Sequence, residues 1–326
     1  MSRSIHRRTF LTGTAAAALA VTVAGPARAA TAPRISTAFT LPDDRAYPEG
    51  IALDPRTGDA YVGSYTTGAV YRAARGSRAA EVFLAAGADG RTTANGLEVD
   101  RAGRLWVIDS TAGVDVYELP GRTPLARLTV PGGGPSFVND LAIGPDGTAY
   151  LTDSSRPVVY RVTPADLARA RNGGGATLDA AYDLSAVADP DGLFLNGIVV
   201  DPSGRHLFVV GMTGGGLYRV DTASGAVRQV ALHGGDLTHG DGLELVHGTL
   251  WAAQNAVNTL SRWRLARDGA SARLERRFTD SALQVPTTLA RVHGRLLVVR
   301  SQFDKGGPMG PGVPEEPFTV AWVDGI

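Results

Sequence analysis

The chain has 326 residues with 32 basic and 32 acidic side chains, a balance that excludes a strongly charged nucleic-acid-binding protein. Apolar residues make up 44% of the sequence, as in an ordinary globular protein. Cysteine is absent, which excludes disulfides, thiolate metal sites and a cysteine nucleophile. Outside the N-terminus there is no apolar run of about 20 residues, so we expect no membrane span in the mature protein.

Residues 1–29 have the pattern of an export signal. Arginines precede an apolar run at residues 11–25, and Ala27-Arg28-Ala29 is a small-residue cleavage signature. Arg7-Arg8 followed by Phe10-Leu11 resembles a twin-arginine (Tat) signal, although a general secretory signal with adjoining arginines is the alternative. Cleavage near Ala29 removes four arginines and no acid, and leaves a secreted or extracytoplasmic domain with 28 basic against 32 acidic residues.

One sequence pattern returns six times along the rest of the chain, each time just before a short apolar strand. The equivalent positions are Glu49, Asn95, Asn139, Asn196, Asp241 and Pro286. Their spacings are 46, 44, 57, 45 and 45 residues, with only strand and turn signals inside most intervals. A period of about 45 residues predicts an all-β fold, a six-bladed β-propeller with four-stranded blades over residues 30–326. A β-sandwich is the alternative, but it does not explain six copies at one spacing.

The long interval and the two ends of the chain fit the same fold. Thr163 as N-cap, Pro164 at the first helical position and Asp166 in the first turn predict a short helix that Asn172-Gly173 ends. We expect it between the third and fourth strands of blade three. The last blade supplies only three strands from the C-terminal region, so we expect residues 36–41 to complete it and close the ring.

The equivalent positions are the best candidates for chemistry. The first strand of each propeller blade lines the central channel, so these residues should converge on its mouth. Five of the six carry side-chain oxygens, which is hard to ascribe to turn preferences alone. Carboxylate and amide oxygens suit a hard divalent cation, and calcium takes about 6–8 such ligands. The pattern therefore predicts an open calcium site with positions left for water or substrate, or else a calcium that only clamps the channel.

The ordered pairs Glu49-Gly50, Asn139-Asp140, Asn196-Gly197 and Asp241-Gly242 resemble the SMP-30/gluconolactonase family, across nearly the whole mature chain. Its relatives include diisopropyl fluorophosphatase, the paraoxonases and strictosidine-synthase-like proteins. The resemblance implies a catalytic metal held by Glu49, Asn139, Asn196 and Asp241, and hydrolysis of lactones or of phosphotriester and ester bonds. The metal would polarise the substrate oxygen. Asp241 would activate water as general base or attack directly, and we favour the base role for a lactone.

Three further residues bear on the substrate and the reaction. Sugar lactonases of this family typically carry arginine where this chain has Phe137, which favours a more apolar lactone or ester. Asn95 is a pocket residue and a possible fifth metal ligand. His239, two residues before Asp241, is a candidate general base or supporting partner, although a plain loop histidine is the alternative. Ser154 and Asn255 end second strands and can line the pocket, but turns also favour such residues.

The sequence therefore predicts an exported, metal-dependent hydrolase acting on a small-molecule lactone or ester. A non-catalytic extracellular propeller with a structural calcium, which presents its face to a glycan or protein, is the second hypothesis. A lyase on the same scaffold is the third, since a fold does not dictate its reaction. Motifs of other hydrolases and of nucleotide-binding proteins, such as G-x-S-x-G, H-E-x-x-H and the P-loop, are absent from the sequence.

Overall fold

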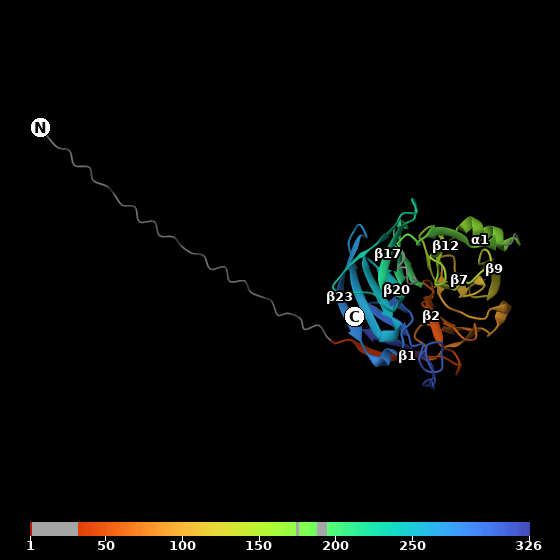
Figure 1. The fold of residues 1–326 in the computed structure, drawn as a ribbon. Coiled ribbons are helices and arrows are strands. Elements are labelled where there is room, and N and C mark those ends of the chain that lie inside the picture. Colours follow the sequence, from red (N-terminus) through yellow and green to blue (C-terminus); the bar gives the residue numbers. More distant parts are fainter. Residues whose placement is uncertain (2–31, 174–175, 188–193) are drawn as a thin grey trace. The chain divides into compact units, whose positions relative to one another are not determined.

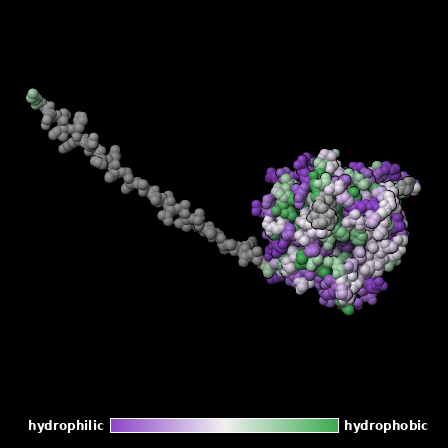
Figure 2. All heavy atoms as spheres, in the orientation of Figure 1, coloured by the Kyte–Doolittle hydropathy of each residue, from purple (hydrophilic) through white to green (hydrophobic). Residues whose placement is uncertain are grey.

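A computed structural model describes Met1 and residues 32–173, 176–187 and 194–326. Residues Ala32–Ile326 form one compact unit. The predicted export signal lies outside the described residues, apart from Met1. No helix among the described residues is long and apolar enough to cross a membrane. On the face in Figure 2, hydrophilic and hydrophobic residues are interspersed, in keeping with the balanced composition.

The described strands form six sheets, and each sheet is one blade of a propeller (Figure 1). Within a blade, successive strands pair antiparallel from the channel outward. The prediction of an all-β, six-bladed propeller is therefore confirmed. In blade one the strands are β2 (Pro48–Leu53), β3 (Ala60–Ser64), β4 (Val70–Ala73) and β5 (Glu81–Leu84). In blade two they are β6 (Leu97–Val99), β7 (Arg104–Asp109), β8 (Gly113–Glu118) and β9 (Thr123–Thr129).

The other four blades continue the same order. In blade three the strands are β10 (Val138–Ile143), β11 (Ala149–Asp153), β12 (Val158–Val162) and β14 (Asp179–Asp183). In blade four they are β15 (Leu195–Val200), β16 (His206–Gly211), β17 (Gly216–Asp221) and β18 (Val227–Gln229). In blade five they are β20 (Gly240–Val246), β21 (Thr249–Gln254), β22 (Thr259–Leu265) and β23 (Ser271–Thr279). In blade six they are β24 (Leu289–Val292), β25 (Arg295–Val299), β26 (Thr319–Asp324) and β1 (Arg34–Thr40).

A few further elements lie outside the four-stranded blades. The helix α1 (Pro164–Arg171) lies between β12 and β14, as predicted, and Thr163 caps it by accepting a hydrogen bond from the Asp166 backbone N–H. Two short strands, β13 (Ala176–Thr177) and β19 (Ala231–His233), add in parallel to the outer strands β9 and β23. Three 3₁₀ turns are η1 (Ala88–Gly90), η2 (Asn255–Val257) and η3 (Ser281–Leu283).

The ends of the chain share blade six. The strand β1 pairs antiparallel with β26, with Arg34 opposite Asp324 and Thr40 opposite Thr319. Figure 1 places the C-terminus beside β1. The predicted closure of the ring by strands from both termini is confirmed.

The hydrophobic core is divided into clusters that lie between neighbouring blades. Trp106 of blade two packs in one cluster with Tyr160 of blade three, and both are fully buried. Trp263 of blade five likewise packs with Phe208 of blade four. Each fully buried large side chain of this kind contributes about 1.5–3 kcal/mol. The fold is therefore stabilised by blade-to-blade packing around the ring, without disulfides.

The inner strands approach one another closely, and glycine makes this possible. A Cβ atom on Gly50 would lie 2.1 Å from the backbone oxygen of Asn95 in the next blade. A Cβ atom on Gly197 would lie 2.1 Å from the backbone oxygen of Asp241. The glycine that follows several of the repeated polar residues therefore serves close backbone approach.

Candidate functional site

The repeated polar residues come together in one cavity. Glu49, Asn95, Asn139, Asn196 and Asp241 all line a cavity of about 160 Å³ at the starts of the inner strands. These five side chains are buried, and the most accessible of them, Glu49, is only 7% exposed. Because the side chains come from five different blades, their positions are set by the ring of inner strands. No local segment of the chain could bring them together. We call these residues, with their blade-six equivalent, the mouth ring.

The blade-six member of the mouth ring is Thr287, and the prediction of Pro286 is wrong by one residue. Leu289 pairs with Val298 as Ile51 pairs with Val62, which aligns Thr287 with Glu49. The Thr287 hydroxyl also donates a 2.7 Å hydrogen bond to the backbone oxygen of Glu49. The sixth copy has neither a glycine after this position nor an Asn or acidic residue at it, so the pattern alone does not mark its register.

Three amide oxygens of the mouth ring have no hydrogen-bond partner among the described residues. These buried atoms are the Oδ1 atoms of Asn95, Asn139 and Asn196. A buried polar atom without a partner costs about 1–3 kcal/mol, so three in one cavity indicate a ligand that satisfies them together. No three His, Cys, Asp or Glu side chains gather as a metal site within the described residues. A cation here would therefore rely on amide oxygens beside Glu49 and Asp241, and such oxygens fit a hard divalent cation.

The Asn139 amide is oriented by Ser154. The Ser154 hydroxyl has one proton, which it donates to the backbone oxygen of Leu195 at 2.6 Å. It can therefore only accept a hydrogen bond from Asn139, whose Nδ2 lies 2.9 Å away. This arrangement holds Asn139 with its Oδ1 free of protein partners. The orientation is thus fixed before any ligand binds.

Asp241 is oriented in a similar way by Asn255. The Asn255 Oδ1 accepts a hydrogen bond from the backbone N–H of Ala256 at 2.5 Å, so its Nδ2 group must face the other way. That Nδ2 donates a 2.6 Å hydrogen bond to Asp241 Oδ2. Asn255 also lines the cavity. One carboxylate oxygen of Asp241 is therefore held in place by a neutral donor.

In each blade, the inner-strand residue two positions after the mouth-ring residue pairs with a residue of the second strand. Ser154 and Asn255 each lie three positions after that second-strand residue, and they belong to a second set of equivalent positions. We call this set the supporting ring: Tyr65, Ser110, Ser154, Met212, Asn255 and Ser301. Met212 approaches Asn196, whose Nδ2 lies 3.6 Å from the Met212 sulfur. The supporting ring therefore places a side chain against the mouth ring in several blades.

The environment of the mouth ring disfavours the charged forms of its two carboxylates. Burial raises the pKa of Glu49 well above its usual value, and the negative charges of Asp241 and Asp140 raise it further. Burial likewise raises the pKa of Asp241, while the hydrogen bond from Asn255 opposes that shift. The cavity lining contains no Lys, Arg or His among the described residues. These carboxylates need protons or a bound cation to compensate their charge.

The outer part of the cavity is apolar, and most of it was not predicted. Phe137, the one apolar residue predicted, lines the cavity together with Tyr65, Met212, Phe194, Phe303, Pro308 and Met309. Phe194 directly precedes β15, and Phe303, Pro308 and Met309 lie in the long loop between β25 and β26. Phe194 stands two residues before Asn196, as Phe137 stands two residues before Asn139, so the repeat could have indicated it. The residues of the long loop follow no repeat, and no sequence signal marked them.

His239 lies just before β20 and adopts a positive φ of 61°. Its backbone N–H donates to the Met212 oxygen at 2.9 Å, and its own oxygen accepts from the Asn255 N–H at 3.0 Å. It does not contribute to the lining of the cavity. A role for its side chain therefore stays a prediction.

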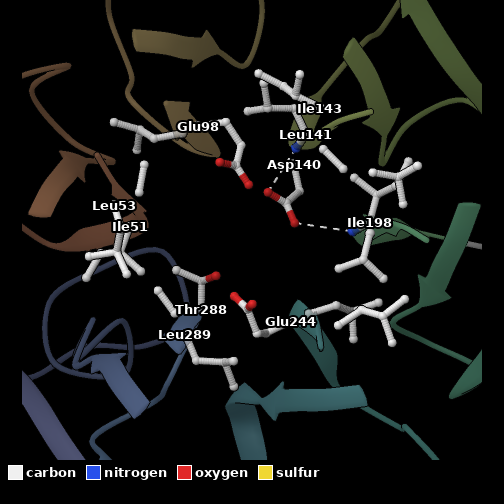
Figure 3. Close-up of a pocket in the computed structure, with 18 of the residues that line it drawn as sticks. Ile51, Leu53, Glu98, Asp140, Leu141, Ile143, Ile198, Glu244, Thr288 and Leu289 are labelled. Atoms are coloured by element: carbon white, nitrogen blue, oxygen red, sulfur yellow. Dashed lines mark hydrogen bonds between the residues drawn. The ribbon is translucent and has the colours of Figure 1, made fainter. Parts of the chain in front are cut away.

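A second group of acidic side chains occupies the channel beyond the mouth. Figure 3 shows Glu98, Asp140 and Glu244 directed into the space between the blades. Burial, with the charges of Glu244 and Asp140, raises the pKa of Glu98 to about 8. Burial raises the pKa of Asp140 and of Glu244 to about 7. We call these three residues the acidic channel.

Neither a family model nor a curated protein matches the sequence, but solved structures share its fold. The major allergen Mala s 1 of Malassezia sympodialis has a TM-score of 0.65 and 18% identity, over 86% of this chain and 93% of that one. A gluconolactonase from Xanthomonas campestris has a TM-score of 0.62 and 18% identity, over 90% and 89% of the two chains. Virginiamycin B lyase from Staphylococcus aureus has a TM-score of 0.58 and 12% identity, over 90% and 100%.

At these identities the likeness establishes the fold. A gluconolactonase among the neighbours agrees with the resemblance to the SMP-30/gluconolactonase family. The set also includes a lyase, so the shared scaffold is compatible with either class of reaction.

Proposed function

We propose that this protein is a metal-dependent hydrolase that cleaves a lactone or another ester. The observation that carries the proposal is the set of three unpartnered, buried amide oxygens that share one cavity with Glu49 and Asp241. A propeller that only binds a partner through its outer face has no need of such a set on its axis. The gluconolactonase among proteins of the same fold is consistent with this chemistry.

The metal would be held by Glu49, Asn139, Asn196 and Asp241, with Asn95 as a fifth oxygen donor. All five offer oxygen and none offers nitrogen or sulfur, a donor set that favours calcium over zinc or copper. When bound, such a cation supplies Lewis acidity that polarises a carbonyl oxygen and stabilises negative charge on it.

The residues of the chain supply the general base, the orientation of the oxygen ligands and the exclusion of water. Asp241 lies in the cavity with one carboxylate oxygen held by Asn255, so its orientation is set before substrate arrives. It accepts a proton from the attacking water as general base. Ser154 keeps the Asn139 oxygen directed away from its own hydroxyl. The apolar outer lining excludes bulk water from the reacting group. His239 is an alternative base in this scheme.

The proposal is tested by metal analysis of the purified protein, followed by a panel of lactones and aryl esters with and without chelator. We expect about one calcium per chain at the mouth ring and turnover that chelator abolishes and calcium restores. The product mass separates the reaction classes, because hydrolysis adds one water to the substrate whereas elimination by a lyase adds none. A protein without metal, or turnover that is indifferent to chelator, would refute the proposal.

A role outside the cytoplasm is a separate proposal, carried by the arginine-rich and apolar segment at residues 1–29. Expression of the full chain, followed by fractionation and N-terminal sequencing, is the test. We expect a mature N-terminus near Ala30. Substitution of both Arg7 and Arg8 by lysine should block export if the Tat route is used.

A further inference from the structure

The wall above the mouth ring is built mainly from aromatic rings. Phe137 and Phe194 form one pair, with ring centroids 6.4 Å apart. Tyr65 and Phe303 form a second pair, with centroids 5.2 Å apart. All four rings line the cavity that holds the mouth ring, and we call them the aromatic wall.

Phe194 continues this wall into solvent. Its side chain is 41% exposed, and that of Met309, which also lines the cavity, is 42% exposed. Phe194 has a φ of 36°, a conformation that is unfavourable for a bulky residue. Tyr47, His239 and Val285 occupy the same repeat position in their blades and also have a positive φ, so the blade sets this conformation. The exposed ring of Phe194 extends the cavity wall outward, where it can contact a ligand.

Hydrogen bonds anchor the opposite side of the wall, which carries Phe303. Gln302 and Glu315 exchange two hydrogen bonds of 2.8 Å across the base of the long loop between β25 and β26. The Tyr47 hydroxyl donates to the backbone oxygen of Lys305 at 2.9 Å. These contacts anchor the loop that carries Phe303 and Met309. The wall is therefore formed without a ligand.

The charges of the cavity narrow the choice of ligand. Its described lining has two carboxylates and no basic side chain, so an anionic substrate group would meet no counter-charge beyond the metal. Apart from the mouth ring, the only polar side chains in the described lining are Tyr65 and Asn255, and the Asn255 amide already bonds to Asp241 and Ala256. A polyhydroxylated ligand would leave most of its hydroxyls unpaired against aromatic rings.

We propose that the substrate is an uncharged lactone or ester that carries an aromatic substituent, held against the aromatic wall. This inference rests on the proposed function, because it places the reacting group over the mouth ring. The cavity of about 160 Å³ matches the space that one benzene-sized group needs. The reacting ring therefore fills the cavity, and the substituent extends outward between Phe194 and Met309.

Three γ-butyrolactones test the proposal, with phenyl, cyclohexyl or hydroxymethyl substituents, assayed on the calcium-loaded protein. We expect kcat/KM for the phenyl compound to exceed that for the hydroxymethyl compound by about ten-fold or more, from apolar burial. It should exceed that for the cyclohexyl compound by about 2- to 10-fold, from ring–ring contact. A cyclohexyl compound that equals or exceeds the phenyl compound, or a preference for hydroxymethyl, overturns the proposal.

Variants assign the effect to the wall. Phe194→Leu keeps an apolar side chain and should remove the phenyl-over-cyclohexyl preference, whereas Phe194→Asn should weaken both compounds relative to hydroxymethyl. Val82 is 47% exposed on the outer strand β5, so Val82→Asn removes an exposed apolar side chain without touching the cavity. It should leave the preferences unchanged. Unchanged preferences in both Phe194 variants would overturn the proposal.

Binding of the matching lactams, measured by calorimetry, separates this inference from the proposed function. Lactams resist hydrolysis, so a phenyl-over-cyclohexyl preference in their dissociation constants supports the aromatic subsite even if no lactone is turned over. Turnover of unsubstituted γ-butyrolactone that depends on calcium supports the hydrolase even if the phenyl preference is absent. Equal binding of all three lactams overturns the inference alone.

Discussion

The mouth ring and the acidic channel both lie on the inner strands, and yet their buried polar groups are compensated in different ways. At the mouth, three neutral amides accompany two carboxylates, and partners such as Ser154 and Asn255 fix their orientation. Three residues further along the strands, about 10 Å away, the channel holds Glu98 and Glu244 without amides between them. The pKa values of about 8 and 7 let these two side chains become neutral by taking up protons near neutral pH.

This difference separates two ways of handling buried charge. Amide oxygens cannot take up protons near neutral pH, so the three unpartnered ones at the mouth require an outside ligand. The acidic channel requires only protons, and Asp140 is already satisfied in part by the backbone N–H groups of Leu141 and Ile198. We infer that a cation prefers the mouth.

The largest effect is expected from two substitutions on the single strand β20. Asp241→Asn should lower kcat by about 10²- to 10⁴-fold, because the general base is lost. Glu244→Gln, three residues away in the acidic channel, should leave kcat within a few-fold of the wild type. Steady-state kinetics with a substrate found in the panel make the comparison. Similar losses in both variants would mean that the channel takes part in the chemistry.

Calcium should stabilise the folded protein through the mouth ring. At about 100 times its dissociation constant, calcium adds about 2.7 kcal/mol and should raise Tm by about 5–10 °C. Asn196→Leu should abolish most of this rise, whereas Glu98→Gln should preserve it. Thermal unfolding with calcium or chelator measures both. The opposite result, with the rise lost in Glu98→Gln alone, would place the cation in the acidic channel.

Ser154→Ala should weaken calcium binding by about 10-fold or more, because Asn139 loses the partner that orients its amide. Ser110→Ala is the matched control, since Ser110 occupies the equivalent position in blade two and its hydroxyl makes no hydrogen bond to any described residue. Calorimetric titration with calcium compares the two variants. Equal affinities would show that the Asn139 amide needs no such support.

The smallest effect concerns the pH dependence of stability. The pKa of Glu98 is about 8 in the folded protein, against 4.5 for an ordinary glutamate. Folding therefore binds a proton between these values, and stability falls as pH rises from 4.5 to 8. Glu98→Gln removes this loss and should stabilise the calcium-free protein at pH 8.5, with little effect at pH 4.5. A gain in Tm at high pH only would confirm it, and an equal gain at both values of pH would contradict it.

The sequence predicted the features that repeat. Six copies of one pattern were enough to identify the fold, the inner strands and the polar residues that share the cavity, because strand alternation and blade period place equivalent residues at equivalent points. The shift from Pro286 to Thr287 marks the limit of that reasoning. In a copy without the glycine and without an Asn or acidic residue, the register depends on pairing with the next strand, and the pattern alone does not contain it.

The site features that could not be predicted from the sequence are of two kinds. Some are residues in loops, and others are the roles of residues that orient a neighbouring side chain. Phe303 and Met309 reach the cavity from the long loop between β25 and β26, and loop paths depend on tertiary contacts. The sequence indicated that Ser154 and Asn255 end second strands and can line the pocket. It did not indicate their roles, because these depend on which neighbour accepts the hydroxyl proton of Ser154 and which N–H donates to the amide oxygen of Asn255.

The pairing of β1 with β26 has a consequence for how the molecule is made. The first strand to emerge from the ribosome cannot complete its sheet until the last strand has been synthesised. Blades one to five can assemble from local hairpins during translation, whereas the final blade depends on the contact of highest sequence separation and should form late. Until β26 is in place, β1 and the edge of β25 that pairs with β26 stay uncovered. Chains that end prematurely before β26 should therefore be the species most prone to aggregation and proteolysis.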